Sequence, residues 1–397
     1  MINIAILGFG VVGSGVAEVI TMNQEKFKKQ LGQEINIKYI LDLREFPDSP
    51  FADRVVHDYN VILNDDEVSI VAEAMGGLHP AYDFSLQALL KGKSVVTSNK
   101  EVVAEKGDEL LKAAADNGAR YLFEASVGGG IPVLRPLGTC LASNKINEIN
   151  GILNGTTNYI LTQMIDFGKT FEVALKEAQQ KGYAEANPTA DVEGIDACRK
   201  ICILAAIAFG KLINPSEVST QGISKIRLED VKNAADAGYA IKLIGQAKDV
   251  NGKMSVSVAP RLVPHTNLLS KVDDVFNGIL VNGNAVDDVI FIGRGAGMMP
   301  TASAVVADIL DIAGRPELKN QIWDKADKTD LADANEKVCS FYVCAKGGEN
   351  EISSVFEGFK AISSRDGEFA FITPKMKKGD FSEKIAKIDS VSFFEIL

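Results

Sequence analysis

Apolar residues in the first third of the chain come in short runs separated by amphipathic stretches. Ile2–Leu7 is a continuous apolar run, typical of a buried strand, and a helical pattern follows from Ser14 to Met22. Further strands are predicted at 35–41, 70–73, 94–97 and 120–123, and helices at 81–91 and 106–117. This alternation predicts an α/β domain built on a doubly wound (Rossmann) parallel sheet.

The pattern changes in the middle of the chain, where strands and helices no longer alternate one by one. Helices are predicted at 159–167, 170–181, 196–209 and 227–236, and strands at 145–153, 239–248, 254–260, 277–281 and 288–292. We therefore expect an α+β domain over residues 131–300, after a nucleotide-binding domain of residues 1–130. An apolar helix at 301–313 is expected to pack back onto the first domain and complete it.

The last part of the chain predicts a small module of its own. Residues 314–335 are charged and contain the only tryptophan, Trp323, so we interpret them as a linker with a short helix. Residues 336–397 are predicted to form strands at 338–345, 368–373 and 390–396 and helices at 352–362 and 381–388. A module of this size suits binding or dimerisation better than catalysis.

A glycine motif stands directly between the first strand and the first helix. It reads Gly8, Phe9, Gly10, Val11, Val12, Gly13, which is GxGxxG in the context of strand, turn and helix. The first glycine permits a tight turn, the second lets the backbone approach a pyrophosphate, and the third allows close packing of helix on strand. This position predicts a dinucleotide site.

Polar residues follow the other predicted strands at the edge where such sheets bind ligands. Asp42 ends the second strand, where an acid accepts the ribose hydroxyls of NAD, and Arg44 would instead suit the 2′-phosphate of NADP. Both cofactors therefore stay open. Thr97, Ser98 and Lys100 lie at the end of a later strand, where Lys100 is either an ordinary loop lysine or a group near the nicotinamide.

Tyr183–Gly210 combines a loop rich in carboxylates with an almost wholly apolar helix. The acids are Glu185, Asp191, Glu193 and Asp196, and Lys200 follows Asp196 by one helical turn. An apolar helix of this kind is normally buried. An amine beside carboxylates at the start of such a helix suits proton transfer. A surface ion pair is the competing interpretation.

Three further loops have the composition of binding sites. Glu124–Pro132 is glycine-rich and suits a hard cation held by carbonyl oxygens, or is only a flexible turn. Asn154–Asn158 places hydroxyl and amide groups at a helix start, which suits a small polar substrate or simple capping. Gly293–Thr301 is a second glycine-rich loop before an apolar helix whose first amides would close over a cofactor.

Composition restricts the compartment and the partners. The chain has 397 residues, 46% of them hydrophobic, and a net charge of -11, which disfavours nucleic acid and anionic membranes. No run is apolar and long enough to span a membrane, and no export leader precedes the first strand. The five cysteines lack metal-site spacing and suit reduced thiols. We therefore predict a cytoplasmic enzyme.

Several of these motifs together resemble the homoserine dehydrogenase family. They are GFGVVG at 8–13, TSNK at 97–100, EASVGGGIP at 124–132, GILNGTTNYIL at 151–161, the segment 182–200, and GRGAGMMPTA at 293–302. The resemblance covers residues 2 to about 313. It implies reversible oxidation of L-homoserine to L-aspartate 4-semialdehyde with NAD or NADP, on the route to threonine and methionine.

The resemblance also implies roles for matched positions. Lys200 and Lys100 correspond to catalytic lysines, and Asp196 to an acid that orients the reacting group. The implied substrate-binding residues are Glu185, Asp191, Gly155 and Thr156. The implied cofactor-binding residues are Gly8, Phe9, Gly10, Val11, Val12, Gly13, Asp42, Arg44, Thr97, Ser98, Lys100, Gly295 and Thr301. A sodium or potassium ion is expected at Glu124, Val127, Gly129 and Ile131. These roles favour function over the ion-pair interpretation of Lys200.

Members of this family imply a homodimer or homotetramer through the middle domain. The C-terminal module resembles a shortened ACT domain, with one strand fewer than usual and with Gly347-Gly348-Glu349-Asn350 in place of the usual turn before the first helix. Two other functions stay open. One is an oxidoreductase of the same architecture that acts on another amino acid or aldehyde, and the other is a nucleotide-sensing regulator without turnover.

Overall fold

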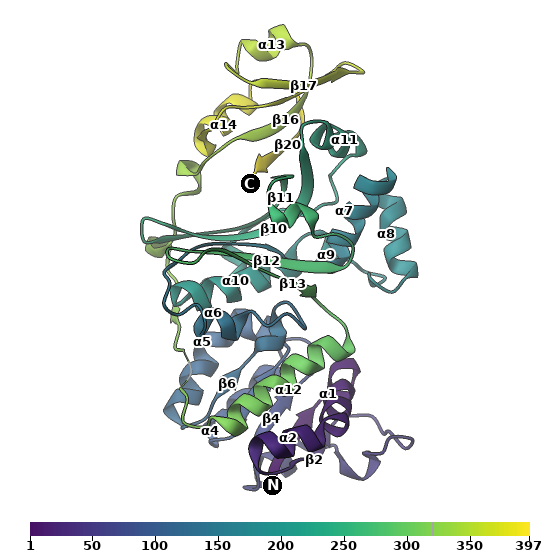
Figure 1. The fold of residues 1–397 in the computed structure, drawn as a ribbon, viewed down its shortest axis with the longest axis vertical. Helices are drawn as coiled ribbons and strands as arrows, with labels where there is room; N and C mark the ends of the chain where they lie inside the picture. Colours follow the sequence, from purple (N-terminus) through teal and green to yellow (C-terminus); the bar gives the residue numbers. More distant parts are fainter. Residues whose placement is uncertain (320) are drawn as a thin grey trace. The chain divides into compact units, whose positions relative to one another are not determined.

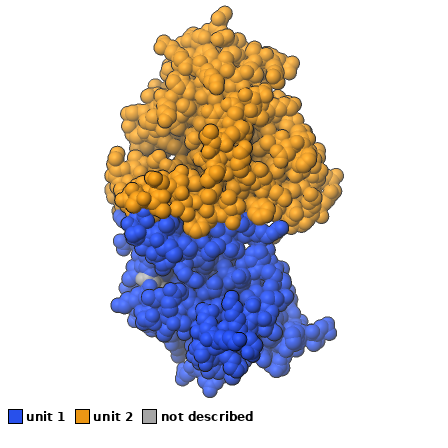
Figure 2. Space-filling model, viewed as in Figure 1, with its two compact units in different colours: residues 1–144, 202–216, 293–326 blue, residues 145–201, 217–292, 327–397 orange. Residues whose placement is uncertain are grey.

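The computed structural model describes residues 1–319 and 321–397. Contacts between residues divide the chain into two compact units, which Figure 2 colours blue and orange. Unit 1 comprises residues 1–144, 202–216 and 293–326, and unit 2 comprises residues 145–201, 217–292 and 327–397. Each unit contains a large sheet of its own.

Unit 1 is built on a six-stranded parallel sheet (Figure 1). Its strands are β1 (Ile2–Leu7), β2 (Ile35–Leu41), β3 (Val55–Val56), β4 (Val68–Glu73), β5 (Ser94–Thr97) and β6 (Tyr121–Leu122). Their order across the sheet is β3-β2-β1-β4-β5-β6, and all neighbours are parallel. This is the strand order of dinucleotide-binding sheets, so the predicted doubly wound α/β domain is confirmed.

The helices of unit 1 follow the strands in sequence. They are α1 (Val11–Met22), α2 (Gln24–Leu31), α3 (Tyr59–Leu63), α4 (Ala81–Leu90), α5 (Lys100–Asp116), α6 (Leu134–Gly138) and α12 (Met298–Gly314). The predicted start of α5 at residue 106 is wrong. The side-chain oxygen of Asn99 accepts a hydrogen bond from the Val102 amide (3.3 Å) and caps the helix. Lys100 therefore lies in the first turn of α5.

Helix α12 packs against α1 in the apolar core of unit 1. A Cβ atom at Gly15 of α1 would lie 2.9 Å from Met298 Cγ and 3.0 Å from Ala302 Cβ, so the two helices touch closely. Val305 and Ile309 of the same helix are fully buried among the side chains of β1, β2 and α1. A segment distant in sequence thus covers one face of the parallel sheet.

Trp323, which follows α12 in the sequence, packs against α5 and Phe123. Trp323 is buried, forms an edge contact with Phe123 at 5.2 Å, and lies where a Cβ atom at Gly107 of α5 would be 2.7 Å away. Strand β14 (Asp324–Lys325) pairs with β8 (Lys211–Leu212). The short helix predicted within 314–335 is present as a single 3-10 turn at 328–330, and a second 3-10 turn follows at 334–336.

Unit 2 is built on a mixed sheet that combines the middle domain with the C-terminal module (Figure 1). The first part contains β7 (Ile146–Ile152), β10 (Tyr239–Val250), β11 (Lys253–Pro264), β12 (Phe276–Gly283) and β13 (Asp287–Arg294), and the second part contains β16 (Phe341–Lys346), β17 (Lys360–Arg365), β18 (Glu368–Ile372) and β20 (Ser390–Ile396). The order is β13-β12-β7-β10-β11-β20-β16-β18-β17, and the short strand β9 (Ser219–Thr220) also pairs with β11.

The helices of unit 2 place the polar loops of the sequence analysis. They are α7 (Gly155–Phe167), α8 (Phe171–Gln180), α9 (Thr189–Val192), α11 (Leu228–Asp236), α13 (Glu349–Ser353) and α14 (Lys378–Ile385), together with the first half of α10 (Ile195–Phe209), whose residues from 202 on belong to unit 1. Helix α7 begins at Gly155 and not at residue 159 as predicted. The Asn154 side-chain oxygen caps it by accepting a hydrogen bond from the Thr157 amide (2.9 Å). Helix α10 lies on β10, where Gly245 leaves room for Ile201.

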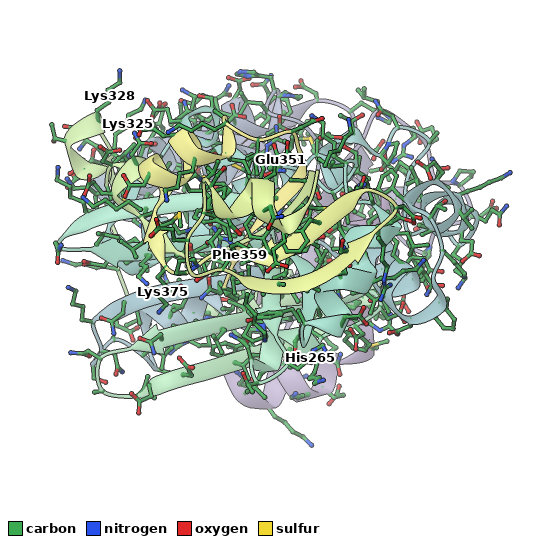
Figure 3. All side chains as sticks on the ribbon, turned by 90° about the horizontal axis from the view of Figure 1, so that it is seen from above. His265, Lys325, Lys328, Glu351, Phe359 and Lys375 are labelled. Atoms are coloured by element: carbon green, nitrogen blue, oxygen red, sulfur yellow. The ribbon has the colours of Figure 1, made fainter. Side chains whose placement is uncertain are left out.

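The C-terminal module differs from the prediction in one element. The helix predicted at 352–362 is wrong after residue 353, because Gly358 adopts φ +67° and the chain turns into β17. Phe359 lies at that turn (Figure 3) and packs 5.2 Å from the Phe371 ring. The module is therefore βαββαβ with four antiparallel strands, the ferredoxin-like arrangement. The expectation that one strand is missing is wrong.

A buried acid fixes the module to α11. Asp230 of α11 is fully buried and accepts hydrogen bonds from the Tyr342 hydroxyl (3.0 Å) and the Ser392 hydroxyl (2.6 Å) of the module. Arg227 binds Asp230 (3.1 Å) and Glu368 of β18 (2.9 Å). Every polar atom that Asp230 buries has a partner, which is the condition for burying a charge.

Among the described residues, none of the helices has both the length and the apolar character needed to cross a bilayer.

Candidate active site

The turn between β1 and α1 is shaped for a phosphate group. Gly8 adopts φ +88°, a conformation that favours glycine. A Cβ atom at Gly13 would lie 1.9 Å from the Gly8 carbonyl oxygen, so only glycine permits this contact of helix and strand. A Cβ atom at Gly10 would meet nothing within 4 Å, so open space lies above the turn. That space at the start of α1 fits a pyrophosphate.

Asp42 lies beside the same turn, at the end of β2. Its Oδ2 accepts a hydrogen bond from the Phe9 amide (2.8 Å), and Arg44 donates to both of its carboxylate oxygens (3.0 Å each). The guanidinium of Arg44 holds the pKa of Asp42 well below its usual range. The His57 Nδ1 lies 2.7 Å from the Asp42 carbonyl oxygen, which raises the pKa of that imidazole.

These residues surround a cavity of about 560 Å³ in unit 1. It is lined by Gly8, Gly10, Leu41, Asp42, Leu43, Arg44, His57, Tyr59, Ala74, Met75, Gly76, Pro80 and Phe84. The structure thus gathers the glycine turn, Asp42 and Arg44 on one cavity. The residues fit a nicotinamide dinucleotide, with the phosphates at the open space above Gly10.

Two of the acids, Asp191 and Asp196, form one cluster in unit 2 with Asn154 and Lys200. Lys200 is buried on α10, and its Nζ donates to Asp196 Oδ2 (2.7 Å) and to the Leu153 carbonyl oxygen (2.8 Å). The Asn154 side chain donates to Asp196 Oδ2 (2.9 Å) and to Asp191 Oδ1 (2.8 Å). Asn154 thus separates two carboxylates, and the amine of Lys200 compensates the charge of one of them.

Lys200 and Asp196 are buried, so their contact is not the surface ion pair of the competing interpretation. The side chain of Lys200 is 10% exposed and that of Asp196 is 9% exposed. Removing one partner of a buried pair typically costs about 3–5 kcal/mol, because the remaining charge is uncompensated. A small part of the Lys200 side chain remains exposed.

Three predicted substrate residues lie around this cluster, with different surroundings. Gly155 follows the cap of α7, and a Cβ atom there would lie 2.7 Å from the Val275 carbonyl oxygen. The Thr156 hydroxyl donates to the Tyr183 carbonyl oxygen (2.6 Å) and so holds the start of the acidic loop. Glu185 is exposed on that loop, and its carboxylate takes no part in the hydrogen bonds of the Lys200 cluster.

Glu124 uses its carboxylate in a way that the sequence does not reveal. Its two oxygens accept hydrogen bonds from the amides of Val133 (2.6 Å), Leu134 (2.9 Å) and Arg135 (2.7 Å) at the start of α6. The amide of Glu124 donates to Asp308 of α12 (2.8 Å), and burial raises the pKa of Asp308 to about 7. The carbonyl oxygen of Glu124, and not its side chain, is therefore the atom left for a cation.

The predicted cation loop packs against the second glycine-rich loop. A Cβ atom at Gly129 would lie 2.6 Å from the Gly295 carbonyl oxygen, and one at Gly130 would lie 2.8 Å from Pro300 Cβ. Among the described residues, the carbonyl oxygens of Val127, Gly129 and Ile131 accept no backbone hydrogen bond, and no cluster of histidine, cysteine and acidic side chains suits a metal. Unpaired carbonyl oxygens in a tight loop fit a hard monovalent cation.

The remaining predicted cofactor residues lie at the ends of two helices of unit 1. Lys100 is half-buried in the first turn of α5, and Ser98 lies just before its cap. The Thr97 hydroxyl points into the protein, where it donates to Glu73 (2.5 Å). Thr301 is half-buried near the start of α12.

Sequence reasoning missed the residue that organises the Lys200 cluster. Asn154 was expected only to cap a helix or to touch substrate, yet its amide bridges Asp191 and Asp196, which lie 37 and 42 positions away along the chain. No local pattern indicates such a contact. Its position immediately before a helix start was the only available sign.

The comparisons with known proteins agree on one family. A family model described as "Homoserine dehydrogenase" matches residues 132–310, and one described as "Homoserine dehydrogenase, NAD binding domain" matches residues 8–124. A homoserine dehydrogenase of Neisseria gonorrhoeae is 44% identical over 315 residues, which are 79% of this chain and 72% of that protein.

Two solved structures show the same likeness. A homoserine dehydrogenase from Thiobacillus denitrificans superposes with a TM-score of 0.90 at 34% identity, over 100% of this chain and 98% of that one. A hyperthermophilic archaeal homoserine dehydrogenase in complex with NADPH has a TM-score of 0.69 at 30% identity, over 81% of this chain and 99% of that one.

The open space above Gly10 leads to a test of the cavity. Gly10→Ala should fold with unchanged thermal stability, because its Cβ meets no protein atom, yet the Cβ would occupy the phosphate position. We expect the dissociation constant of NADPH, measured by fluorescence titration, to rise at least about tenfold, equivalent to roughly 1.4 kcal/mol. NADPH binding as tight as in the wild type would contradict the proposed phosphate position.

Two glycine variants serve as controls for Gly10→Ala. Gly138→Ala places a Cβ in open space away from this cavity and should change neither stability nor binding. Gly13→Ala should lose both thermal stability and NADPH binding, because its Cβ collides with the Gly8 carbonyl oxygen.

Proposed function

The chain belongs to the homoserine dehydrogenase family, and from this premise we propose which side chains perform the reaction. The protein is an NAD(P)-dependent oxidoreductase that interconverts L-homoserine and L-aspartate 4-semialdehyde. We propose that Lys200 transfers the proton of this reaction. The observation that supports this role is the buried amine held between Asp196 and the Leu153 carbonyl oxygen.

The hydrogen bonds of Lys200 leave one donor for the substrate. An ammonium group has three N–H bonds, and two of them point to Asp196 and Leu153. In aldehyde reduction the third would donate its proton to the carbonyl oxygen, while the bound nicotinamide supplies the hydride. In alcohol oxidation the neutral amine would accept the hydroxyl proton. Asp196 keeps the amine in position in both directions.

The other predicted residues are proposed to bind and orient. Glu185 and Asp191 would hold the ammonium group of the substrate, next to the amides at Gly155 and Thr156 on the first turn of α7. Glu185 is exposed on its loop and so remains accessible to a ligand. Lys100 would lie near the cofactor and substrate. Either NAD or NADP would occupy the cavity beside Asp42 and Arg44.

Three further proposals concern the surroundings of the reaction. A sodium or potassium ion would bind the carbonyl oxygens of Glu124, Val127, Gly129 and Ile131 and so hold the loop that precedes α6. We propose that the protein assembles as a homodimer or homotetramer. We also propose a cytoplasmic location.

Replacement of Lys200 tests the central proposal. Lys200→Ala should lower kcat for L-homoserine by about 10²–10⁴-fold, the usual contribution of a general acid–base group. The NADPH dissociation constant should stay within about twofold, because Lys200 is not among the residues that line the cavity of unit 1. Lys176→Ala, an exposed lysine on α8, serves as the control. Wild-type turnover in Lys200→Ala would refute the assignment.

Asn154 provides a second test of the same cluster. Asn154→Asp keeps a capping oxygen for α7 but replaces the amide donor by a third carboxylate beside Asp191 and Asp196. We expect kcat/KM for L-homoserine to fall at least about tenfold, measured at saturating cofactor, because like charges would push the acids apart. Thr170→Asp, at the cap of α8, makes the same kind of change away from the cluster. Equal losses in the two variants would contradict the bridging role.

The proposed cation has a separate test. Steady-state rates should fall several-fold when sodium and potassium are replaced by tetramethylammonium, which is too large for a loop of carbonyl oxygens. Full activity in tetramethylammonium would contradict the proposed cation site.

A further inference from the structure

A buried acid lies at the carboxyl end of a central strand of the parallel sheet, and the proposals above give it no role. Glu73 is the last residue of β4, and its side chain is completely buried. Its surroundings supply hydrogen bonds but, among the described residues, no lysine or arginine partner. Burying a carboxyl group without a cation opposes folding and raises its pKa, here to about 7. An apolar residue of similar size would fill the position more favourably.

The two oxygens of Glu73 connect the ends of two neighbouring strands. Oε1 accepts a hydrogen bond from the Met75 amide (2.7 Å), just after β4. Oε2 accepts a hydrogen bond from the Thr97 hydroxyl (2.5 Å), at the end of β5. The same hydroxyl oxygen accepts a hydrogen bond from the Asn99 amide (2.8 Å). One carboxyl group therefore fixes the first residues of two loops.

The first of these loops forms a wall of the nucleotide cavity. Ala74, Met75 and Gly76 line that cavity. A Cβ atom at Gly8 would lie 3.0 Å from Met75 Cγ and 3.1 Å from the Ala74 carbonyl oxygen, so this loop packs directly on the glycine turn. A displacement of Met75 would consequently reach the backbone that surrounds the phosphate position.

The second loop leads into α5. The Asn99 side chain donates to the Gly77 carbonyl oxygen (2.7 Å) and caps α5 through the Val102 amide (3.3 Å). The two loops are thus joined twice, once by Glu73 and Thr97 and once by Asn99 and Gly77. Lys100 follows immediately, in the first turn of the helix.

We propose that Glu73 is a positioning residue that holds the cavity wall at 74–77 and the start of α5 in one fixed arrangement. Through the first loop it sets the shape of the nucleotide cavity, and through the second it sets the place of the Lys100 amine. The part that concerns Lys100 rests on the proposed function, whereas the part that concerns the cavity does not.

Two substitutions distinguish positioning from simple filling of space. Glu73→Gln retains both contacts, because its oxygen accepts from the Met75 amide and its NH₂ group donates to the Thr97 hydroxyl oxygen. Glu73→Leu has similar size but makes neither hydrogen bond. Positioning requires the glutamine variant to rescue binding, whereas filling of space predicts that the two variants behave alike.

The measurement is the dissociation constant of NADPH by fluorescence titration, without homoserine, together with the thermal midpoint of the free protein. We expect Glu73→Leu to raise the dissociation constant about tenfold and Glu73→Gln less than about threefold. Thr97→Val, which removes the hydroxyl and keeps Glu73, should shift binding in the same direction as Glu73→Leu. If Glu73→Leu does not fold, Thr97→Val provides the test of the positioning role.

Asp311→Asn is the matched control, because Asp311 is a buried acid of the same unit that pairs with Arg120 (2.8 Å) near the end of α12. It should lower the thermal midpoint without changing NADPH binding. Wild-type binding in Glu73→Leu, equal losses in the leucine and glutamine variants, or an equal loss in Asp311→Asn would overturn the proposal. Because homoserine is absent, a failure of the Lys200 proposal would leave these results unchanged.

Discussion

The buried hydrogen bonds around the Lys200 amine are the constraint on which the rest of unit 2 depends. An apolar helix brings a charged group into the protein, and that charge is tolerable only if it has a counter-charge and hydrogen-bond acceptors. Asp196 on the first turn of α10 and the Leu153 carbonyl oxygen after β7 supply them, and Asn154 at the cap of α7 joins Asp196 to Asp191 of α9. The Asn154 amide is decisive, because a neutral group with two donors allows two carboxylates to share a small space.

Unit 1 follows the same principle with a different purpose. Its buried acids Glu73, Glu124 and Asp308 accept hydrogen bonds from backbone amides and so fix those amides in place. The atoms left to meet ligands are mostly backbone amides and carbonyl oxygens of glycine-rich loops. This division explains why the loops are rich in glycine although the unit binds charged molecules: side chains provide the scaffold and the main chain provides the contacts.

The sequence predicted the parallel sheet, the glycine turn and the residue types of the site, because these follow from local periodicity and spacing. It placed the starts of α5 and α7 too late, since Asn99 and Asn154 cap each helix before its apolar repeat becomes visible. It continued the helix predicted from residue 352 as far as residue 362, into the start of β17, whereas Gly358 turns the chain. The contacts of Asn154 and Glu73 were not predictable, because their partners lie far away along the chain or on a neighbouring strand.

The position of the C-terminal module in the sheet of unit 2 has a further consequence. Strand β11 is long, and its outer edge is covered by short pairings with β9 at Ser257–Val258 and with β20 at Arg261–Leu262, and by a bridge between Met254 and Leu331. A strand edge with free amides and carbonyls can recruit other chains and lead to aggregation. By pairing with β11, the last strand of the module covers part of this edge, whatever ligand the module itself binds.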